Sequence, residues 1–78
     1  MSRITSEYTQ TYGNFYDYIS VIPDAGASVR VEFYTGSQWV EDSQSPLTAT
    51  ATVFVRNNSL RFTPTGGGAW IGDGQGAQ

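Results

Sequence analysis

Hydrophobic and polar residues alternate along three stretches of this chain, at positions 28–35, 47–56 and 59–63. A period of two is typical of β-strands that bury one face, because successive side chains point to opposite sides of a sheet. The outer positions of the second stretch are mostly threonines, which suits a solvated sheet surface or one that pairs with another chain. The pattern therefore predicts three strands. Their apolar positions are Val29, Val31, Phe33, Leu47, Ala49, Ala51, Val53, Val55, Leu60 and Phe62.

Turn residues between the alternating stretches predict how these strands pair. Gly36-Ser37 fits a two-residue hairpin turn, which would bring residues 38–41 back beside 28–35. Cross-strand pairs of this kind stabilise a sheet when both members are aromatic or apolar, whereas two like charges oppose pairing. The predicted pairs are Tyr34 with Trp39, Phe33 with Val40 and Glu32 with Glu41.

A second hairpin is predicted at Asn57-Asn58, since asparagine tolerates the positive φ angles that tight turns require. It would pair 47–56 with 59–63, so that the apolar side chains of both strands share one face. The alternation and the turn predict the same register for these two strands. The core residues of this hairpin are therefore the most clearly predicted part of the core. The predicted pairs are Val55 with Leu60, Val53 with Phe62 and, on the opposite face, Phe54 with Arg61.

Two more strands are expected, at 15–22 and at 69–71. Residues 15–22 are rich in aromatic and β-branched side chains and end at a turn that begins with Pro23. With the segments above, the chain is predicted to form one all-β domain over residues 15–71. We expect a small antiparallel sandwich or barrel of about five or six short strands.

The two termini are expected to lie outside this domain. Residues 1–14 contain Ile4, Tyr8 and Tyr12 at intervals of four, which would line one side of a helix. Because serine and threonine are frequent there, an extended N-terminal arm that docks on a neighbour is an equal expectation, and simple disorder is a third. Residues 72–78 are expected to be a glycine-rich, flexible C-terminal tail.

Composition argues against catalysis. The 78 residues include no cysteine, histidine or lysine, so the serine and threonine hydroxyls lack an ordinary activating base. Glu32 and Glu41 would lie about 5 Å apart, as in a retaining glycosidase, but a small sheet cannot easily build the sugar cleft. The glycine runs lack the Lys-Ser/Thr of a phosphate-binding loop. We expect no enzyme activity, no metal and no cofactor.

The missing cysteines also remove the disulfides and most zinc sites that stabilise many small domains. Association with copies of itself or with a larger protein is the expected substitute. The net charge of −3, with only four arginines as basic residues, argues against nucleic-acid binding. No apolar run approaches the roughly 18 residues that span a membrane, and synthesis in the cytoplasm is expected.

Aromatic side chains are the remaining candidates for a binding site. Tyrosine and tryptophan on a sheet face can stack on sugar rings or anchor a protein interface. Tyr34 and Trp39, paired across the first hairpin, would form such a platform, and Trp70-Ile71 would anchor the C-terminal segment on a partner. The predicted partner-binding residues are Tyr8, Tyr12, Tyr34, Trp39, Trp70 and Ile71.

The stretches VRVEFYTGSQWVED and LTATATVFVRNNSLRFTPTGGGAW, about half of the chain, combine short alternating strands with a threonine-rich face and a glycine-rich end. In this texture the chain resembles small all-β structural proteins of tailed bacteriophage particles. The resemblance implies a head decoration, neck or tail component that is present in many copies in the virion.

Two functions follow as alternatives. The first is a particle assembly protein that binds its own copies or a larger virion protein through sheet edges and termini. The second is a carbohydrate-binding or adhesin-like module that presents its aromatic residues to a glycan.

Overall fold

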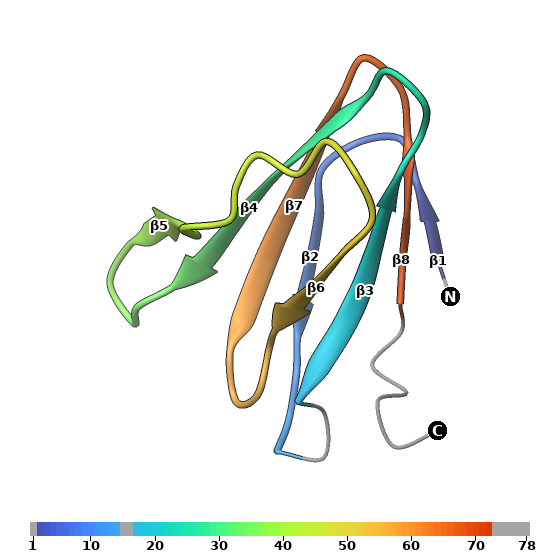
Figure 1. Cartoon of the computed structure of the whole chain (residues 1–78). Coiled ribbons are helices and arrows are strands. Elements are labelled where there is room, and N and C mark those ends of the chain that lie inside the picture. The colour runs from blue at the N-terminus through green and yellow to red at the C-terminus, as the bar shows by residue number, and fades with distance from the viewer. Residues whose placement is uncertain (1, 15–16, 73–78) are drawn as a thin grey trace.

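The computed structural model describes residues 2–14 and 17–72, and all regular secondary structure in these residues is β-strand. The strands form two antiparallel four-stranded sheets that lie against each other around one core (Figure 1). Sheet A has the strand order β1-β8-β3-β6, and sheet B has the order β2-β7-β4-β5. The strands are β1 (Ser2–Ile4), β2 (Tyr8–Thr11), β3 (Tyr18–Pro23), β4 (Ser28–Tyr34), β5 (Trp39–Glu41), β6 (Ala51–Phe54), β7 (Ser59–Thr65) and β8 (Ala69–Ile71).

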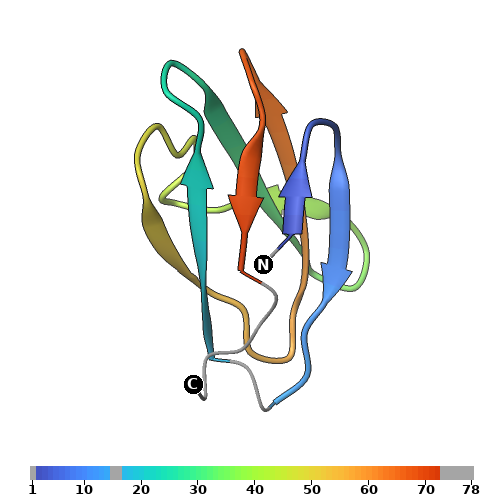
Figure 2. The same ribbon diagram turned by 90° about the vertical axis from the view of Figure 1, so that its right-hand side faces the viewer.

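The chain changes sheet at every connection between consecutive strands except β4 to β5. Figure 2 shows one such crossing, where the chain leaves β1 and returns as β2 in the other sheet. Apart from the β4–β5 hairpin, strands therefore pair with neighbours that are not adjacent to them in the sequence. The core between the sheets consists of buried side chains from both: Ile4, Ile19, Val21, Val53, Ala69 and Ile71 from sheet A, and Val29, Val31, Leu60 and Phe62 from sheet B, with Tyr12, Leu47 and Val55 beside them.

The hairpin predicted at Gly36-Ser37 is confirmed. β4 and β5 pair in the expected register, and the Thr35 amide donates to the Gln38 carbonyl at 2.9 Å across the turn. Gly36 has a φ of 104°, a conformation that favours glycine at this position. The observed pairs are Tyr34 with Trp39, Phe33 with Val40 and Glu32 with Glu41.

The hairpin predicted at Asn57-Asn58 is wrong in its pairing. The turn itself exists, since Asn57 has a φ of 56° and the Asn58 amide donates to the Val55 carbonyl at 3.0 Å. However, β6 pairs with β3 in sheet A, whereas β7 pairs with β2 and β4 in sheet B. The predicted core side chains are all buried, but they meet across the core instead of along one sheet. They are Val53, Val55, Leu60 and Phe62.

The expected N-terminal arm is instead part of both sheets. β1 pairs with β8 and β2 pairs with β7, which brings the number of strands to eight, beyond the five or six expected. Ile4 and Tyr12 are buried in the core. An interval of four residues also keeps side chains on one face of an extended chain, so their spacing did not distinguish a helix from strands.

The expected strand at 47–56 is shorter than its alternation suggested, since β6 begins only at Ala51. Leu47 instead forms an isolated bridge to Val29, with both backbone hydrogen bonds made at 2.8 and 2.9 Å. The short last strand is confirmed as β8, and the Gly72 amide continues it by donating to the Ser20 carbonyl at 2.7 Å. Residues 73–78 of the expected tail, and residues 15–16 of the expected strand before Pro23, lie outside the described part of the chain.

The glycine run before β8 has a structural role. The Gly68 carbonyl accepts the Asp24 amide at 3.0 Å, and the Gly68 amide donates to the Asp24 carboxylate at 2.9 Å. A Cβ atom at this position would lie 2.6 Å from the Ile4 carbonyl oxygen, so only glycine fits without a backbone shift. The run is therefore packed against the rest of the fold.

Candidate functional site

Exposed aromatic side chains gather on the outer face of sheet A. Tyr18, Phe54 and Trp70 are 55%, 50% and 41% exposed. The residue that follows each of them in the chain is buried in the core. Tyr18 and Phe54 are directly opposite each other on β3 and β6, with ring centroids 5.4 Å apart in an edge-to-face arrangement. Trp70 lies toward the other end of the strands, opposite Ile22. Large apolar groups gathered on one exposed face are typical of interaction surfaces.

An ion pair stands at the Trp70 end of this face. Arg3 donates to both carboxylate oxygens of Asp24 at 2.6 Å, and its guanidinium carbon lies 5.5 Å from the centroid of the Trp70 ring. The Arg3 hydrogen bonds, and after them the Gly68 amide, lower the pKa of Asp24 to about 2. Arg3 is thus held in place by a bidentate contact while it lies beside the indole.

A second ion pair stands at the Tyr18 and Phe54 end of the face. The Arg56 guanidinium lies 3.3 Å from the Asp17 carboxylate, and the Val55 amide donates to the Asp17 carbonyl. Each ion pair is neutral, so the two pairs add no net charge to a face whose protein carries −3 overall. The outer face of sheet A is therefore aromatic in its main features and electrically balanced at both ends.

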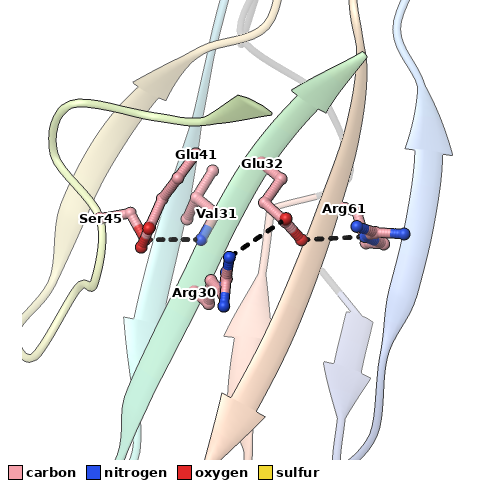
Figure 3. A network of polar contacts seen from close by, with 6 residues as sticks. All are labelled: Arg30, Val31, Glu32, Glu41, Ser45 and Arg61. Atoms are coloured by element: carbon pink, nitrogen blue, oxygen red, sulfur yellow. Dashed lines mark hydrogen bonds and ion pairs between the residues drawn. The ribbon is translucent and has the colours of Figure 1, made fainter. Parts of the chain in front are cut away.

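The outer face of sheet B is built around a buried carboxylate. Glu32 on β4 is only 7% exposed, although it points away from the core. It accepts a hydrogen bond from the Arg61 Nε at 2.9 Å, and Arg30 lies 3.6 Å from its other oxygen, as Figure 3 shows. The hydrogen bond from Arg61 holds the pKa of Glu32 below its usual range. This network joins β4 to β7 across their ladder.

The sugar-platform pair, Tyr34 and Trp39, lies on this same face. Their ring centroids are 5.1 Å apart with a tilt of 51°, so the two rings do not form one plane. The Arg61 guanidinium carbon lies 4.5 Å from the Trp39 ring centroid and covers part of it. Tyr34 remains 41% exposed. Part of the predicted platform is therefore occupied by the protein's own arginine.

Glu32 and Glu41 lie opposite each other, as the predicted register required. Glu32 is turned toward Arg61, while Glu41 accepts a hydrogen bond from the Ser45 hydroxyl at 2.7 Å (Figure 3). The same hydroxyl accepts the Val31 amide at 3.0 Å, which ties the segment after β5 to β4. Both carboxylates thus serve structural contacts.

The predicted partner-binding residues separate into several places. Trp70 lies on the outer face of sheet A, whereas Tyr34 and Trp39 lie on that of sheet B. Tyr8 is half-buried on edge strand β2, where its ring stacks on Phe62 at 6.4 Å. Two predictions are corrected, because Tyr12 and Ile71 are 2% and 1% exposed in the core and present no surface to a partner.

Tyr18 and Phe54 were not among the predicted partner-binding residues, although both are exposed aromatic side chains. The alternation in 47–56 already placed Phe54 among threonines on the polar side, and an aromatic ring in that position was the available signal. Tyr18 had the same signal, since it alternates with Ile19 and Val21, which are buried. Their direct pairing could not be expected, because the sequence paired the 47–56 stretch with 59–63.

A small pocket opens at the side of the molecule where β5 and β6 form the sheet edges. It has a volume of about 230 Å³. Two aromatic and two polar side chains contribute to its lining: Phe33, Phe54, Asp42 and Asn58. None of these residues was predicted to bind a ligand.

Within residues 2–14 and 17–72, no group of three or more acidic side chains is placed to hold a metal ion. The same residues contain no helix long and apolar enough to cross a membrane. Comparison of the chain with protein families, curated proteins and solved structures found no match.

Proposed function

We propose that this protein is an assembly component of a virus particle, a small β-sandwich of the head decoration, neck or tail type. It binds copies of itself through the outer face of sheet A and works through protein contacts. One observation carries the proposal: three of the four large, exposed apolar side chains among the described residues lie on that one face. Aromatic residues are enriched in interface cores, where charged residues are depleted.

The charge pattern of this face is compatible with association between identical chains. Two copies of a protein with a net charge of −3 repel each other over long range. The outer face of sheet A adds nothing to this repulsion, because Arg3–Asp24 and Arg56–Asp17 are closed pairs. A symmetric dimer contact uses the same patch on both partners, so a balanced face suits a second copy.

Catalysis is not part of the proposal. The chain has no histidine, cysteine or lysine, and the two facing carboxylates, Glu32 and Glu41, are both engaged in structural contacts. A catalytic acid or base must reach the proton that it transfers, and these groups are directed to Arg61 and Ser45.

Size-exclusion chromatography with light scattering tests the proposal on the wild type and on two matched variants. Trp70 and Tyr34 are both 41% exposed, but they lie on opposite sheets. We expect an oligomer for the wild type and for Tyr34→Ser, and a monomer for Trp70→Ser. A wild type that stays monomeric at all concentrations would overturn the proposal. Mass spectrometry of purified particles tests its location in the virion.

A carbohydrate-binding or adhesin-like module is the second candidate, and the adjacent rings of Tyr34 and Trp39 favour it. Apolar faces of sugar rings can lie on such aromatic groups. A glycan that shifts the tryptophan fluorescence of a monomeric wild type, but not of Tyr34→Ala, would support this function over assembly. An assembled wild type whose fluorescence no glycan changes would count against it.

A further inference from the structure

The pocket at the open side of the two sheets has the size of a side-chain site. Its volume of about 230 Å³ lies below the roughly 300–1,000 Å³ of pockets that enclose drug-sized ligands. Phe33 on β4 and Phe54 on β6 supply apolar surface, while Asp42 follows β5 and Asn58 precedes β7. The pocket therefore combines two aromatic rings with one carboxylate and one amide.

The carboxylate in this pocket has no cationic partner among the described residues. All four arginines of the chain are engaged elsewhere: Arg3 with Asp24, Arg56 with Asp17, and Arg30 and Arg61 with Glu32. Asp42 accepts one side-chain hydrogen bond, from the Gln44 amide at 2.9 Å to Oδ1. Its charge is thus available to a cation from outside the chain.

Asp42 is also fixed in position. Its amide donates to the Val31 carbonyl at 2.8 Å, and its carbonyl accepts the Ser45 amide at 3.0 Å. With the Gln44 contact, three hydrogen bonds hold its backbone and one carboxylate oxygen. A group that is already ordered binds a ligand at a lower entropic cost.

The chemistry of the lining suits a guanidinium group better than other cations. A guanidinium is planar, stacks on aromatic faces and donates in several directions, whereas an ammonium is a compact, strongly hydrated charge. The Asn58 side chain makes no hydrogen bond within the described residues, and its carbonyl oxygen can accept a second donor. Phe33 and Phe54 would contact the plane and the methylene stem.

We infer that the pocket formed by Phe33, Asp42, Phe54 and Asn58 is a docking site for one arginine side chain of a protein partner. The inference rests on the proposed function in that it assumes a protein partner, here one other than a copy of this chain, whose four arginines are all paired. It adds a charged, directional contact at the sheet edges to the aromatic contact on sheet A. Charge-assisted contacts of this kind fix the orientation of a partner.

An NMR titration of the isotopically labelled protein with Nα-acetyl-arginine amide tests the inference. We expect saturable shifts centred on Asp42 and Asn58, and binding that weakens as salt is added. The neutral analogue of the probe, Nα-acetyl-citrulline amide, has nearly the same shape and is expected to give no saturable shift. The inference would be overturned if the citrulline analogue or the corresponding lysine analogue bound as tightly as the arginine probe. Binding of a neutral monosaccharide in the pocket, with no binding of the arginine probe, would also overturn it.

Two neighbouring acids supply matched variants. Asp42→Asn keeps the acceptor for the Gln44 amide and removes the charge, so affinity for the arginine probe should fall by at least about tenfold. Glu41→Gln changes the charge by the same amount next to the pocket, and its affinity should equal that of the wild type. An unchanged affinity of Asp42→Asn would contradict the site, and the wild-type comparison of arginine with citrulline holds even if this variant does not fold.

The assembly proposal fails separately from this inference. Light scattering of Trp70→Ser reports on the outer face of sheet A, while the probe titration reports on the pocket. Arginine binding by a wild type that never assembles would remove the proposed function and leave the pocket. Because Phe54 belongs to both surfaces, assembly would leave the proposed function and remove the pocket only if neither the wild type nor the monomeric Trp70→Ser variant bound arginine.

Discussion

On the outer face of sheet B, Arg61 donates to Glu32 and lies over Trp39, so a carboxylate and an indole are both covered by the protein's own side chains. On the outer face of sheet A, Tyr18 and Phe54 contact each other and remain half exposed. Both faces have aromatic residues and arginines. The difference is that sheet B satisfies its polar groups internally, whereas sheet A leaves apolar surface exposed.

This difference has a simple structural origin. The ladder between β4 and β7 sets Glu32 directly beside Arg61, so the charges of sheet B meet in its centre. In sheet A the charges lie at the ends, in Arg3–Asp24 and Arg56–Asp17. Charges in the centre of a face make it polar, whereas ion pairs at the two ends of sheet A leave its aromatic side chains exposed.

The largest effect on stability is expected from Gly68→Ala. This variant tests the close packing of Gly68 against Ile4 near the Trp70 end of sheet A. The new Cβ would lie 2.6 Å from the Ile4 carbonyl oxygen, and relieving that overlap should cost about 1–3 kcal/mol. Denaturant unfolding measures the loss. Gly13→Ala is the control, because no atom lies within 4 Å of its added Cβ, and an equal loss in both variants would contradict the packing argument.

A smaller loss is expected from Glu32→Gln, which removes the charge at the centre of sheet B. The amide can still accept from Arg61, but the charge-assisted bond is lost, and about 1 kcal/mol of stability should go with it. Glu41→Gln should lie within about 0.5 kcal/mol of the wild type, since Glu41 is exposed. Urea unfolding of both variants compares the two carboxylates, and equal losses would show that Glu32 has no special place in the network.

Lowering the pH tests the contribution of the Arg3–Asp24 ion pair of sheet A to stability. The pKa of Asp24 is about 2 in the folded protein and near 3.8 without its partners, so the folded state favours the charged form. Its contribution to stability is therefore complete above about pH 4 and is lost as the pH falls toward 2. Thermal unfolding between pH 5 and pH 2 should show a shallower decline for Asp24→Asn than for the wild type, and parallel curves would refute this role of Asp24.

The smallest difference in stability is expected between Trp70→Ser and Tyr34→Ser. Both side chains are 41% exposed and each contacts a neighbour on its own face, Arg3 for Trp70 and Trp39 for Tyr34, so each substitution removes a similar fraction of half-buried ring surface. The two variants should therefore unfold at nearly the same denaturant concentration as each other while differing in assembly. A large destabilisation by Trp70→Ser would mean that the indole supports the fold more than it serves a partner.

Local pattern predicted local structure well in this protein. The β4–β5 hairpin and its register followed from Gly36-Ser37 and the alternation on both sides. The buried positions of β6 and β7 were also predicted, because alternation defines which side chains point inward whatever the strand pairs with. The same alternation put Phe54 on the outer side, although its importance was missed.

Strand pairing and the composition of each face were decided by the tertiary structure. A strand whose inner residues are apolar can return in its own sheet or cross to the opposite one, and Val55 and Leu60 are buried either way. Here the chain crosses at every connection but one, so β6 pairs with β3, and Phe54 meets Tyr18. The sequence alone thus determined an all-β chain with defined inner positions. Which outer residues lie together follows from the strand order, because non-local pairing depends on the best packing of all strands at once.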